Sequence, residues 1–468
     1  MKLGLVSLGC DKNTVDSERI LAALGGHGAH HVRDLTEADV IVVNTCGFID
    51  AAKEESIGVL LDVSRLKHEG NCRAVVALGC LVEQYRDELE SSLPEIDLFI
   101  GLRDVDRLIP ELRDRGLLGP RLEDHPGVRQ PIAERRHVRY LKVSEGCDHG
   151  CAFCAIPMWR GKHRSFSADA LLAEAQRLEA QGAVELNLVA QDLAFYGREF
   201  GDGKDLVSLL RRLLDETSIP WFRLLYIYSA GLREPLVELI ATEERILPYI
   251  DMPIQHASDP VLERMRRPER RDRLYARIEG LRSDIPDLTL RTTVMVGFPG
   301  ETEAEFRSLL DFMEDVEFDR LGAFAFSPQE NTRAADMQEL FVPEDVAASR
   351  LEEVIEVQRA ISADLMQREV GRTCEAIIER PEDGRVVGRT RAQADDVDGF
   401  TYLGPASDML PAGTLVEVEI TGAGDFDLEG KILREVRSVT AADGLTVPGH
   451  VGRALPVATI GLDGGWGR

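Results

Sequence analysis

The hydrophobic positions of the chain fall into three successive patterns. Up to about residue 130, short apolar runs alternate with helix-forming stretches, which predicts βαβ units and a parallel sheet. From residue 137 to about 369, six β-branched or aromatic runs alternate with helical segments, which predicts an incomplete, six-unit barrel of the TIM type. Residues 371–437 change to five short strands with turns, which suit a small closed β-barrel of OB-like size. We therefore expect an α/β protein with domains at 1–130, 137–369 and 371–437.

The segments outside these patterns are of two kinds. Residues 120–136 are rich in Pro, Gly and charge and are expected to be a linker, and residues 438–468 hold seven glycines without periodicity and predict a mostly disordered tail. No apolar run approaches the roughly 18 residues that a membrane helix needs. The apolar opening ends at Gly9 and is followed by Asp11 and Lys12, so it is too short for a secretory signal. The sequence predicts a cytoplasmic protein without a membrane partner.

The overall charge bears on the kind of partner. The 468 residues carry a formal net charge of −27, with 44% hydrophobic residues, so the chain can bury sizeable cores. A protein that holds RNA mainly through phosphates needs a clear basic surface. The acidity therefore favours a basic partner over a nucleic acid.

Three of the eight cysteines lie in one short loop, EGCDHGCAFCAIP. Cys147, Cys151 and Cys154 are spaced Cys-x3-Cys-x2-Cys, and Gly146 and Gly150 are expected to allow tight turns. Thiolates this close favour a soft metal or an iron–sulfur cluster, whereas a structural zinc site normally needs a fourth ligand, which no nearby cysteine supplies. Three ligands on a four-iron cluster leave one iron open, as a catalytic cluster requires.

Three further cysteines each follow a predicted strand of the first domain. Cys10, Cys46 and Cys80 end the runs LVSLGC, VIVVNTC and AVVALGC. Parallel strands place their carboxyl ends on one edge of the sheet, so these thiols are expected to converge there despite 35 and 33 intervening residues. The alternative is three cysteines that merely pack at strand ends. Cys72, which precedes its strand, and Cys374 are interpreted as ordinary thiols.

The cysteine loop after the first strand of a six-unit barrel resembles that of the radical S-adenosylmethionine enzymes. The resemblance implies that the open iron binds S-adenosylmethionine and that one electron cleaves it to a 5′-deoxyadenosyl radical. An electron donor such as a flavodoxin or ferredoxin is then required. Phe153 is expected near the adenine, and Gln191 and Asp192 near the amino group of S-adenosylmethionine. Their alternative roles are loop packing for Phe153 and capping for the other two.

A narrower resemblance, to the methylthiotransferases, spans nearly all of residues 1–437. SLGCDKNTVDSE, VVNTCGFI and ALGCLVEQY are similar to the three N-terminal motifs of that family, and DMPIQHASDPVLERMRRP and VGFPGETEAEF to its barrel motifs. The family joins a three-cysteine domain, a radical barrel and a terminal barrel called TRAM. By this resemblance Cys10, Cys46 and Cys80 hold a second cluster, so the expected cofactors are two 4Fe-4S clusters and S-adenosylmethionine. No catalytic residue beyond the cluster ligands is predicted, and Gln329, Asn331 and YIYSAGL at 226–232 depart from the family pattern.

The substrate is predicted from the first motif and the last domain. LGCDKNTVDSE resembles the branch that methylthiolates the β-carbon of an aspartate in small-subunit ribosomal protein S-twelve, by hydrogen abstraction and sulfur insertion. Residues 371–440 carry 14 acidic and 8 basic residues, which suits a basic ribosomal protein. Asp395, Asp396 and Asp398 are interpreted as part of this dock, with a merely solvated face as the alternative.

Other interpretations remain open at this point. One rival function is a transfer-RNA adenosine methylthiotransferase, and another is a non-catalytic iron–sulfur factor that binds the ribosome. The basic stretch MWRGKHR, residues 158–164, is interpreted as steering the carboxylates of S-adenosylmethionine and of the substrate aspartate. Steering of an RNA phosphate and simple solvation are its alternatives.

Overall fold

The computed structural model describes residues 1–468 except 123–127, 130, 133–135, 202, 396 and 439–468. The described residues form two compact units, one within Met1–Glu134 and Ala155–Lys162, the other within Arg135–Cys154 and His163–Asp443. The segment directly after Cys154 thus packs with the N-terminal domain, although the sequence pattern assigned it to the barrel. The predicted tail lies outside the described residues from 439 onward. None of the described helices has the length and apolar character needed to span a membrane.

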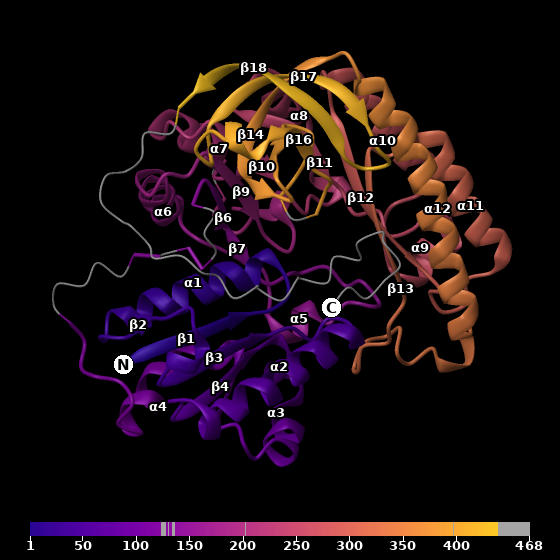
Figure 1. Ribbon diagram of the computed structural model, residues 1–468. Helices are drawn as coiled ribbons and strands as arrows, with labels where there is room; N and C mark the ends of the chain where they lie inside the picture. Colours follow the sequence, from indigo (N-terminus) through magenta and orange to yellow (C-terminus); the bar gives the residue numbers. More distant parts are fainter. Residues whose placement is uncertain (123–127, 130, 133–135, 202, 396, 439–468) are drawn as a thin grey trace. The chain divides into compact units, whose positions relative to one another are not determined.

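The first unit is built on a five-stranded parallel sheet (Figure 1). Its order is β2-β1-β3-β4-β5, and β3 is buried along its whole length. One face packs against α1 and α4, the other against α2 and α3, which explains why the central strands are continuous apolar runs. The strands are β1 (Lys2–Ser7), β2 (His30–His31), β3 (Val40–Thr45), β4 (Ala74–Gly79) and β5 (Leu98–Gly101). The helices are α1 (Asp11–Gly25), α2 (Asp50–Glu69), α3 (Cys80–Ser92), α4 (Leu108–Asp114) and the later α5 (Ile156–Trp159).

The second unit contains the six predicted parallel strands in the order β13-β12-β11-β10-β9-β6. The outward side chains pack against the helices in the largest apolar core that the described residues form. The open, six-unit barrel predicted from the sequence is confirmed. The strands are β6 (Val138–Lys142), β9 (Glu185–Val189), β10 (Trp221–Leu224), β11 (Ile246–Asp251), β12 (Thr289–Val296) and β13 (Arg320–Ala325). The helices that cover them are α6 (Ala168–Ala180), α7 (Leu206–Glu216), α8 (Glu234–Thr242), α9 (Asp259–Arg264), α10 (Arg271–Asp284), α11 (Glu303–Val316) and α12 (Glu344–Glu369).

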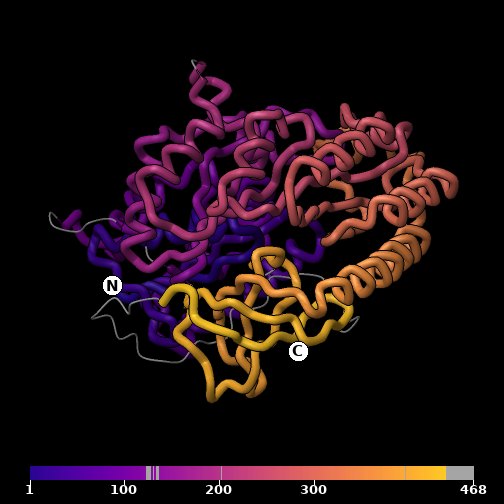
Figure 2. The backbone as a smooth tube through the Cα atoms, turned by 90° about the horizontal axis from the view of Figure 1, so that it is seen from above, coloured from indigo at the N-terminus to yellow at the C-terminus, as the bar shows by residue number. Residues whose placement is uncertain are grey.

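The C-terminal strands close into a separate small barrel, in the order β14-β15-β16-β18-β17. Figure 2 shows the long orange coil of α12 leading into these orange-to-yellow strands. Inward side chains of the six-stranded sheet, among them Trp221 and Tyr249, share an apolar cluster with Ile377 and Leu415 of the small barrel. The small barrel therefore packs against the inner face of the larger one. Its strands are β14 (Thr373–Glu382), β15 (Arg385–Thr390), β16 (Thr401–Pro405), β17 (Leu415–Ala423) and β18 (Leu428–Arg437).

Buried ion pairs join the two barrels. Arg389, whose side chain is fully buried, donates to Glu185 at 2.6 Å and lies 3.9 Å from Asp395. Asp398 accepts a 2.7 Å hydrogen bond from the Tyr249 hydroxyl. The side chains of Asp395 and Asp398 are only 6% and 2% exposed, so their interpretation as an external dock or a solvated face is wrong. A run of charges in a sequence does not reveal whether it faces water or a buried counter-charge, and Asp396 lies outside the described residues.

Candidate functional site

The three N-terminal thiols lie at the carboxyl edge of the first sheet. Cys10 caps α1, Cys46 directly follows β3, and Cys80 begins α3. Burial raises the pKa of Cys46 to about 11 and that of Cys80 to about 12, and the neighbouring thiols, Cys10 for Cys46 and both others for Cys80, add to the rise. The thiols are therefore close enough to interact electrostatically, as the strand-end pattern predicts. Any metal bound here must displace protons from the buried ones.

Two glycines allow the strand ends to approach each other. Gly9 and Gly79 both have positive φ, at 86° and 111°. A Cβ atom on Gly9 would lie 2.9 Å from the Cys46 sulfur, and one on Gly79 would lie 2.4 Å from the Thr45 carbonyl oxygen. The two Leu-Gly-Cys stretches therefore need glycine both for backbone conformation and for space.

Arg160 also belongs to this site, although the sequence analysis interpreted its stretch, MWRGKHR, as steering carboxylates. Arg160 Nη2 donates to Asn13 Oδ1 at 2.6 Å and lies 3.7 Å from the Cys80 sulfur. Arg160 Nη1 lies 3.1 Å from Asp16 Oδ2, and the arginine side chain is only 3% exposed. For Arg160, simple solvation is therefore wrong, and the steering of carboxylates stays a prediction. Its partners are 80 or more residues away in the chain, so no local pattern indicates them.

The second thiol group lies on the loop that follows β6 and β7 (Ser144–Glu145). Cys147, Cys151 and Cys154 are all partly buried, and burial raises the pKa of Cys147 to about 11. Gly146 has a φ of 77°, as its predicted turn requires. Gly150 does not have positive φ, and a Cβ atom there would meet nothing within 4 Å, so neither its conformation nor its surroundings require glycine.

A stack of planar side chains supports this loop. His149 Nε2 lies 2.7 Å from Asp192 Oδ2, and its ring stacks on Tyr228 at 4.2 Å with an interplanar angle of 13°. The Arg267 guanidinium lies 4.2 Å from the centre of the Tyr228 ring, and its Nη1 lies 4.0 Å from the Cys151 sulfur. Apart from the cysteine, only Asp192 was predicted as a site residue. The others stand inside noted motifs, but their contacts reach across the barrel.

Gln191 and Asp192 follow β9 but differ in their contacts. Asp192 accepts from His149 and also from the backbone N–H groups of Ala194 and Tyr228, at 3.1 and 3.3 Å. Gln191 donates to Glu145 at 3.2 Å, while its buried Oε1 has no partner among the described residues. Gln191 therefore keeps an acceptor for a ligand, whereas the Asp192 carboxylate is already occupied.

Phe153, between the second and third cysteines, is 9% exposed. Its ring meets Phe298 edge to face at 6.4 Å, within an apolar cluster that also contains Met265 and Met295. These contacts show how the side chain packs. Its predicted place near an adenine stays a prediction.

Several buried polar atoms of the barrel have no partner among the described residues and could contact a bound cofactor. Side chains on alternate positions of a strand share a face, so Asn187 faces inward with Glu185 and Val189. Buried polar atoms without a partner are rare in proteins, and they fit a polar ligand such as S-adenosylmethionine. In the described part of the chain, no group of three or more His, Cys, Asp or Glu residues is arranged around a single metal ion. The soft thiols themselves suit iron–sulfur chemistry. The unpartnered atoms on the strands of this unit or in the segments that follow them include Ser144 Oγ, Asn187 Oδ1 and Nδ2, Gln191 Oε1, Gln255 Oε1 and Gln329 Oε1.

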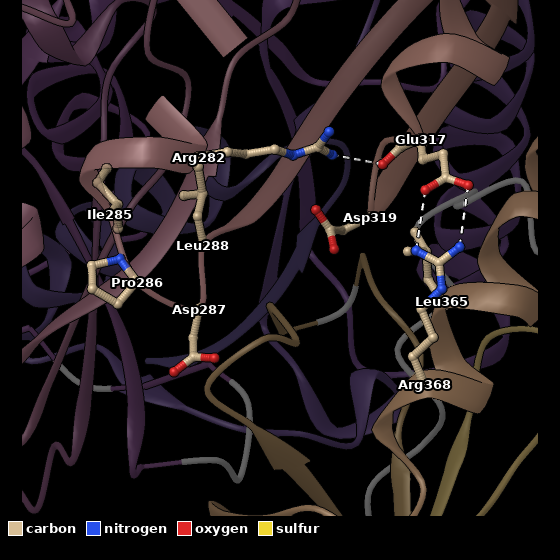
Figure 3. A pocket seen from close by; sticks show the side chains of 9 residues that line it. All are labelled: Arg282, Ile285, Pro286, Asp287, Leu288, Glu317, Asp319, Leu365 and Arg368. Carbon is tan, nitrogen blue, oxygen red and sulfur yellow. Dashed lines mark hydrogen bonds and ion pairs between the residues drawn. The ribbon is translucent and has the colours of Figure 1, made fainter. Parts of the chain in front are cut away.

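A cavity of about 350 Å³ lies at the opposite edge of the six-stranded sheet (Figure 3). Its lining includes residues that precede β12 and β13, at the amino ends of these strands. Glu317 is paired with Arg368 at 3.1 Å, and Asp319 accepts from the Leu290 backbone at 2.9 Å. Glu317 and Asp319 already have partners, and none of the described residues that line this cavity is a cysteine, so it is not part of the candidate site.

Comparison with known proteins assigns the chain to a family. The Uncharacterized protein family UPF0004 matches residues 2–101, the Radical SAM superfamily residues 141–313 and the TRAM domain residues 370–433. Ribosomal protein uS12 methylthiotransferase RimO of Desulforudis audaxviator is 44% identical over 441 residues, 92% of this chain and 97% of that protein. The protein of the same name from Anaeromyxobacter sp. strain K is 43% identical over 470 residues, 98% of both chains. The chain belongs to the RimO family.

This RimO-family chain is therefore a radical S-adenosylmethionine methylthiotransferase, as the two cysteine patterns and barrel motifs predict. Membership in the superfamily implies a 4Fe-4S cluster and S-adenosylmethionine. Among solved structures, the fold is similar to that of the radical S-adenosylmethionine methyltransferase TsrM from Kitasatospora setae with cobalamin and a [4Fe-4S] cluster bound. The TM-score is 0.52 at 12% identity, over 82% of this chain and 80% of that one. The likeness concerns the fold alone.

Proposed function

We propose that this enzyme adds a methylthio group to the β-carbon of an aspartate in ribosomal protein uS12. The observation that carries the proposal is full-length similarity, at 43–44% identity, to relatives named as uS12 methylthiotransferases. The two separate thiol groups support it, because radical generation and sulfur delivery are different tasks. A scaffold protein has no need of two such groups at the reactive edges of two sheets.

In this proposal Cys147, Cys151 and Cys154 hold the first four-iron cluster. When bound, the cluster supplies the electron that cleaves S-adenosylmethionine. The unpartnered Gln191 Oε1 accepts from the amino group of S-adenosylmethionine, and Phe153 lies near its adenine. Asp192 acts through His149, a residue of the cysteine loop itself, whose ring it orients by a contact of 2.7 Å with Nε2.

Cys10, Cys46 and Cys80 hold the second four-iron cluster and serve the transfer of sulfur. Their thiols are buried to different degrees: Cys80 is buried, Cys46 is half-buried and Cys10 is exposed. The exposed thiol marks the side of the site that a substrate can approach. The buried thiols are held by the sheet and by α3.

The acidic C-terminal barrel docks uS12, but through residues other than those first predicted. Asp383 and Asp408 are exposed, and they lie near each other because the Ala406 N–H donates to the Gly384 carbonyl at 2.8 Å. Proteins that bind RNA phosphates are commonly basic, so an exposed acidic corner suits one of them.

The experiment is a competition between substrates. The reconstituted enzyme is incubated without oxygen with S-adenosylmethionine, dithionite, uS12 and transfer RNA together, and both polymers are analysed by mass spectrometry. We expect a methylthio addition on one aspartate of uS12 and none with the Cys147→Ala variant. Methylthioadenosine in the RNA with unmodified uS12 would contradict the proposal and favour the transfer-RNA rival. A failure to form any 5′-deoxyadenosine would favour the non-catalytic one.

A further inference from the structure

The thiol site of the first unit contains a buried positive charge that no cysteine motif indicates. Arg160 is six residues beyond Cys154, the last cysteine of the barrel loop. Between these two residues the chain passes from the second unit to the first, where α5 packs with Cys80, Phe48 and Leu102.

The arginine is fixed by charge-assisted contacts on both nitrogens. Nη2 donates to Asn13 at 2.6 Å, and Nη1 lies 3.1 Å from the Asp16 carboxylate. Asn13 also donates to the carbonyls of Leu8 and Thr45, at 2.9 and 3.2 Å. Arg160 is therefore bound to the side chain that joins the Cys10 and Cys46 loops.

The guanidinium group of Arg160 also faces a cysteine sulfur. Nη2 lies 3.7 Å from the sulfur of Cys80, a distance at which an N–H group donates to a thiolate. A buried cation is costly unless anionic groups lie beside it, and the Asp16 carboxylate lies 3.1 Å from Arg160 Nη1. Three thiolates on a cluster are a further anionic group for this cation to face.

We propose that Arg160 is a positioning residue of the N-terminal thiol site, which holds the Cys10 and Cys46 loops through Asn13 and offsets the negative charge of the metal-bound Cys80. This inference rests on the proposed function, because it needs a cluster at Cys10, Cys46 and Cys80. A positive charge beside a cluster stabilises its reduced form, so Arg160 raises the reduction potential of that cluster.

The test uses the full chain with Cys147, Cys151 and Cys154 replaced by Ala, so that only the N-terminal cluster is present. Its midpoint potential is measured by redox titration followed by electron paramagnetic resonance. In this background Arg160→Gln is expected to lower the potential by about 59 mV, which for one electron is a tenfold change in the reduction equilibrium. Arg160→Lys, which keeps the charge, is expected to lie between Gln and the parent.

Arg103→Gln is the matched control. Arg103 donates to the Met158 carbonyl and lies 3.3 Å from Glu83, so it ties the same segment, but its side chain is 59% exposed. It is expected to leave the potential unchanged. A purely structural role for the segment predicts no change in potential for Arg160→Gln, or equal changes for both variants.

The outcomes separate this inference from the proposed function. The parent here is the variant without the three barrel cysteines. If it binds about four irons and has the same potential as its Arg160→Gln derivative, the role of Arg160 is overturned and the second cluster is supported. Parent protein without iron would overturn both. Loss of iron on Arg160→Gln supports the positioning role if Arg160→Lys retains iron and both variants melt as the iron-free parent does.

Discussion

The enzyme carries two groups of three thiols that are assembled in opposite ways. The barrel thiols come from eight consecutive positions on one loop, 147–154, whereas the N-terminal thiols come from three strand ends in residues 10–80. Each group has one buried arginine near one sulfur, Arg267 at 4.0 Å and Arg160 at 3.7 Å. Local spacing therefore defines the first site, and tertiary packing defines the second.

This difference in assembly indicates which substitutions should disturb each thiol site. The barrel loop depends on a few close contacts, such as the stacking of its own His149 on Tyr228. The N-terminal site depends on the backbone fit of neighbouring strands, since a side chain on Gly79 would overlap Thr45. Substitutions that leave every cysteine in place are therefore expected to affect the two sites unequally.

The largest expected effect is that of Gly79→Ala. Its φ of 111° and the 2.4 Å approach to the Thr45 carbonyl oxygen should together cost about 2–5 kcal/mol of stability in the first unit. The displaced Cys80 should then lose the N-terminal iron, so reconstituted protein is expected to hold about four irons instead of about eight. Iron analysis and thermal melting measure both effects.

Gly150→Ala is the matched control in the barrel loop. A Cβ atom there meets nothing within 4 Å, so iron content and stability are expected to stay unchanged. Equal iron loss from the two variants would contradict the contrast between a locally defined and a packing-defined site.

A smaller effect is expected on the stability of the second unit, which should depend on pH through Glu301. Burial raises the pKa of Glu301 from 4.5 to about 7, although Arg350 lies 3.1 Å away. The folded state therefore binds a proton that the unfolded state has released. Stability should fall by about 3 kcal/mol as pH rises from 4.5 to 7. Urea midpoints of iron-free protein should show this fall, and Glu301→Gln should remove it.

Glu303→Gln serves as the control for this pH dependence. Glu303 contacts the same Arg350 at 3.4 Å, but it is exposed, and its hydrogen bond with Arg307 lowers its pKa. The fall between pH 4.5 and 7 should persist in this variant. If the fall in stability disappeared in Glu303→Gln, or persisted in Glu301→Gln, the pH dependence would belong to another group.

The smallest expected effect concerns substrate docking. Charge reversal by Asp383→Lys with Asp408→Lys should slow association with uS12 about threefold to tenfold at low salt, and less at high salt because screening weakens the attraction. Stopped-flow association rates measure this. Asp398→Asn is the contrasting variant: its buried bond with Tyr249 should make it about 1–3 kcal/mol less stable. A salt-dependent rate defect in Asp398→Asn alone would argue against the exposed corner as the dock.

Much of the architecture could be predicted from the sequence because it depends on the local spacing of apolar residues. The six barrel strands and the five terminal strands follow from apolar runs, and the grouping of Cys10, Cys46 and Cys80 follows from the common edge of parallel strands. Arg160, Arg267 and His149 could not be predicted because their partners are 80, 116 and 43 residues away. The burial of Asp398 could not be predicted either, because its partner Tyr249 belongs to another domain.

Iron analysis of two triple variants tests the central claim, that the thiol groups are separate sites with separate tasks. One variant replaces Cys147, Cys151 and Cys154 by Ala, and the other replaces Cys10, Cys46 and Cys80. We expect about four irons in each and about eight in the parent. Formation of 5′-deoxyadenosine from S-adenosylmethionine should be lost in the first variant and should survive in the second, which no longer modifies uS12. Full iron content in the second variant, or loss of 5′-deoxyadenosine formation in both, would contradict the account.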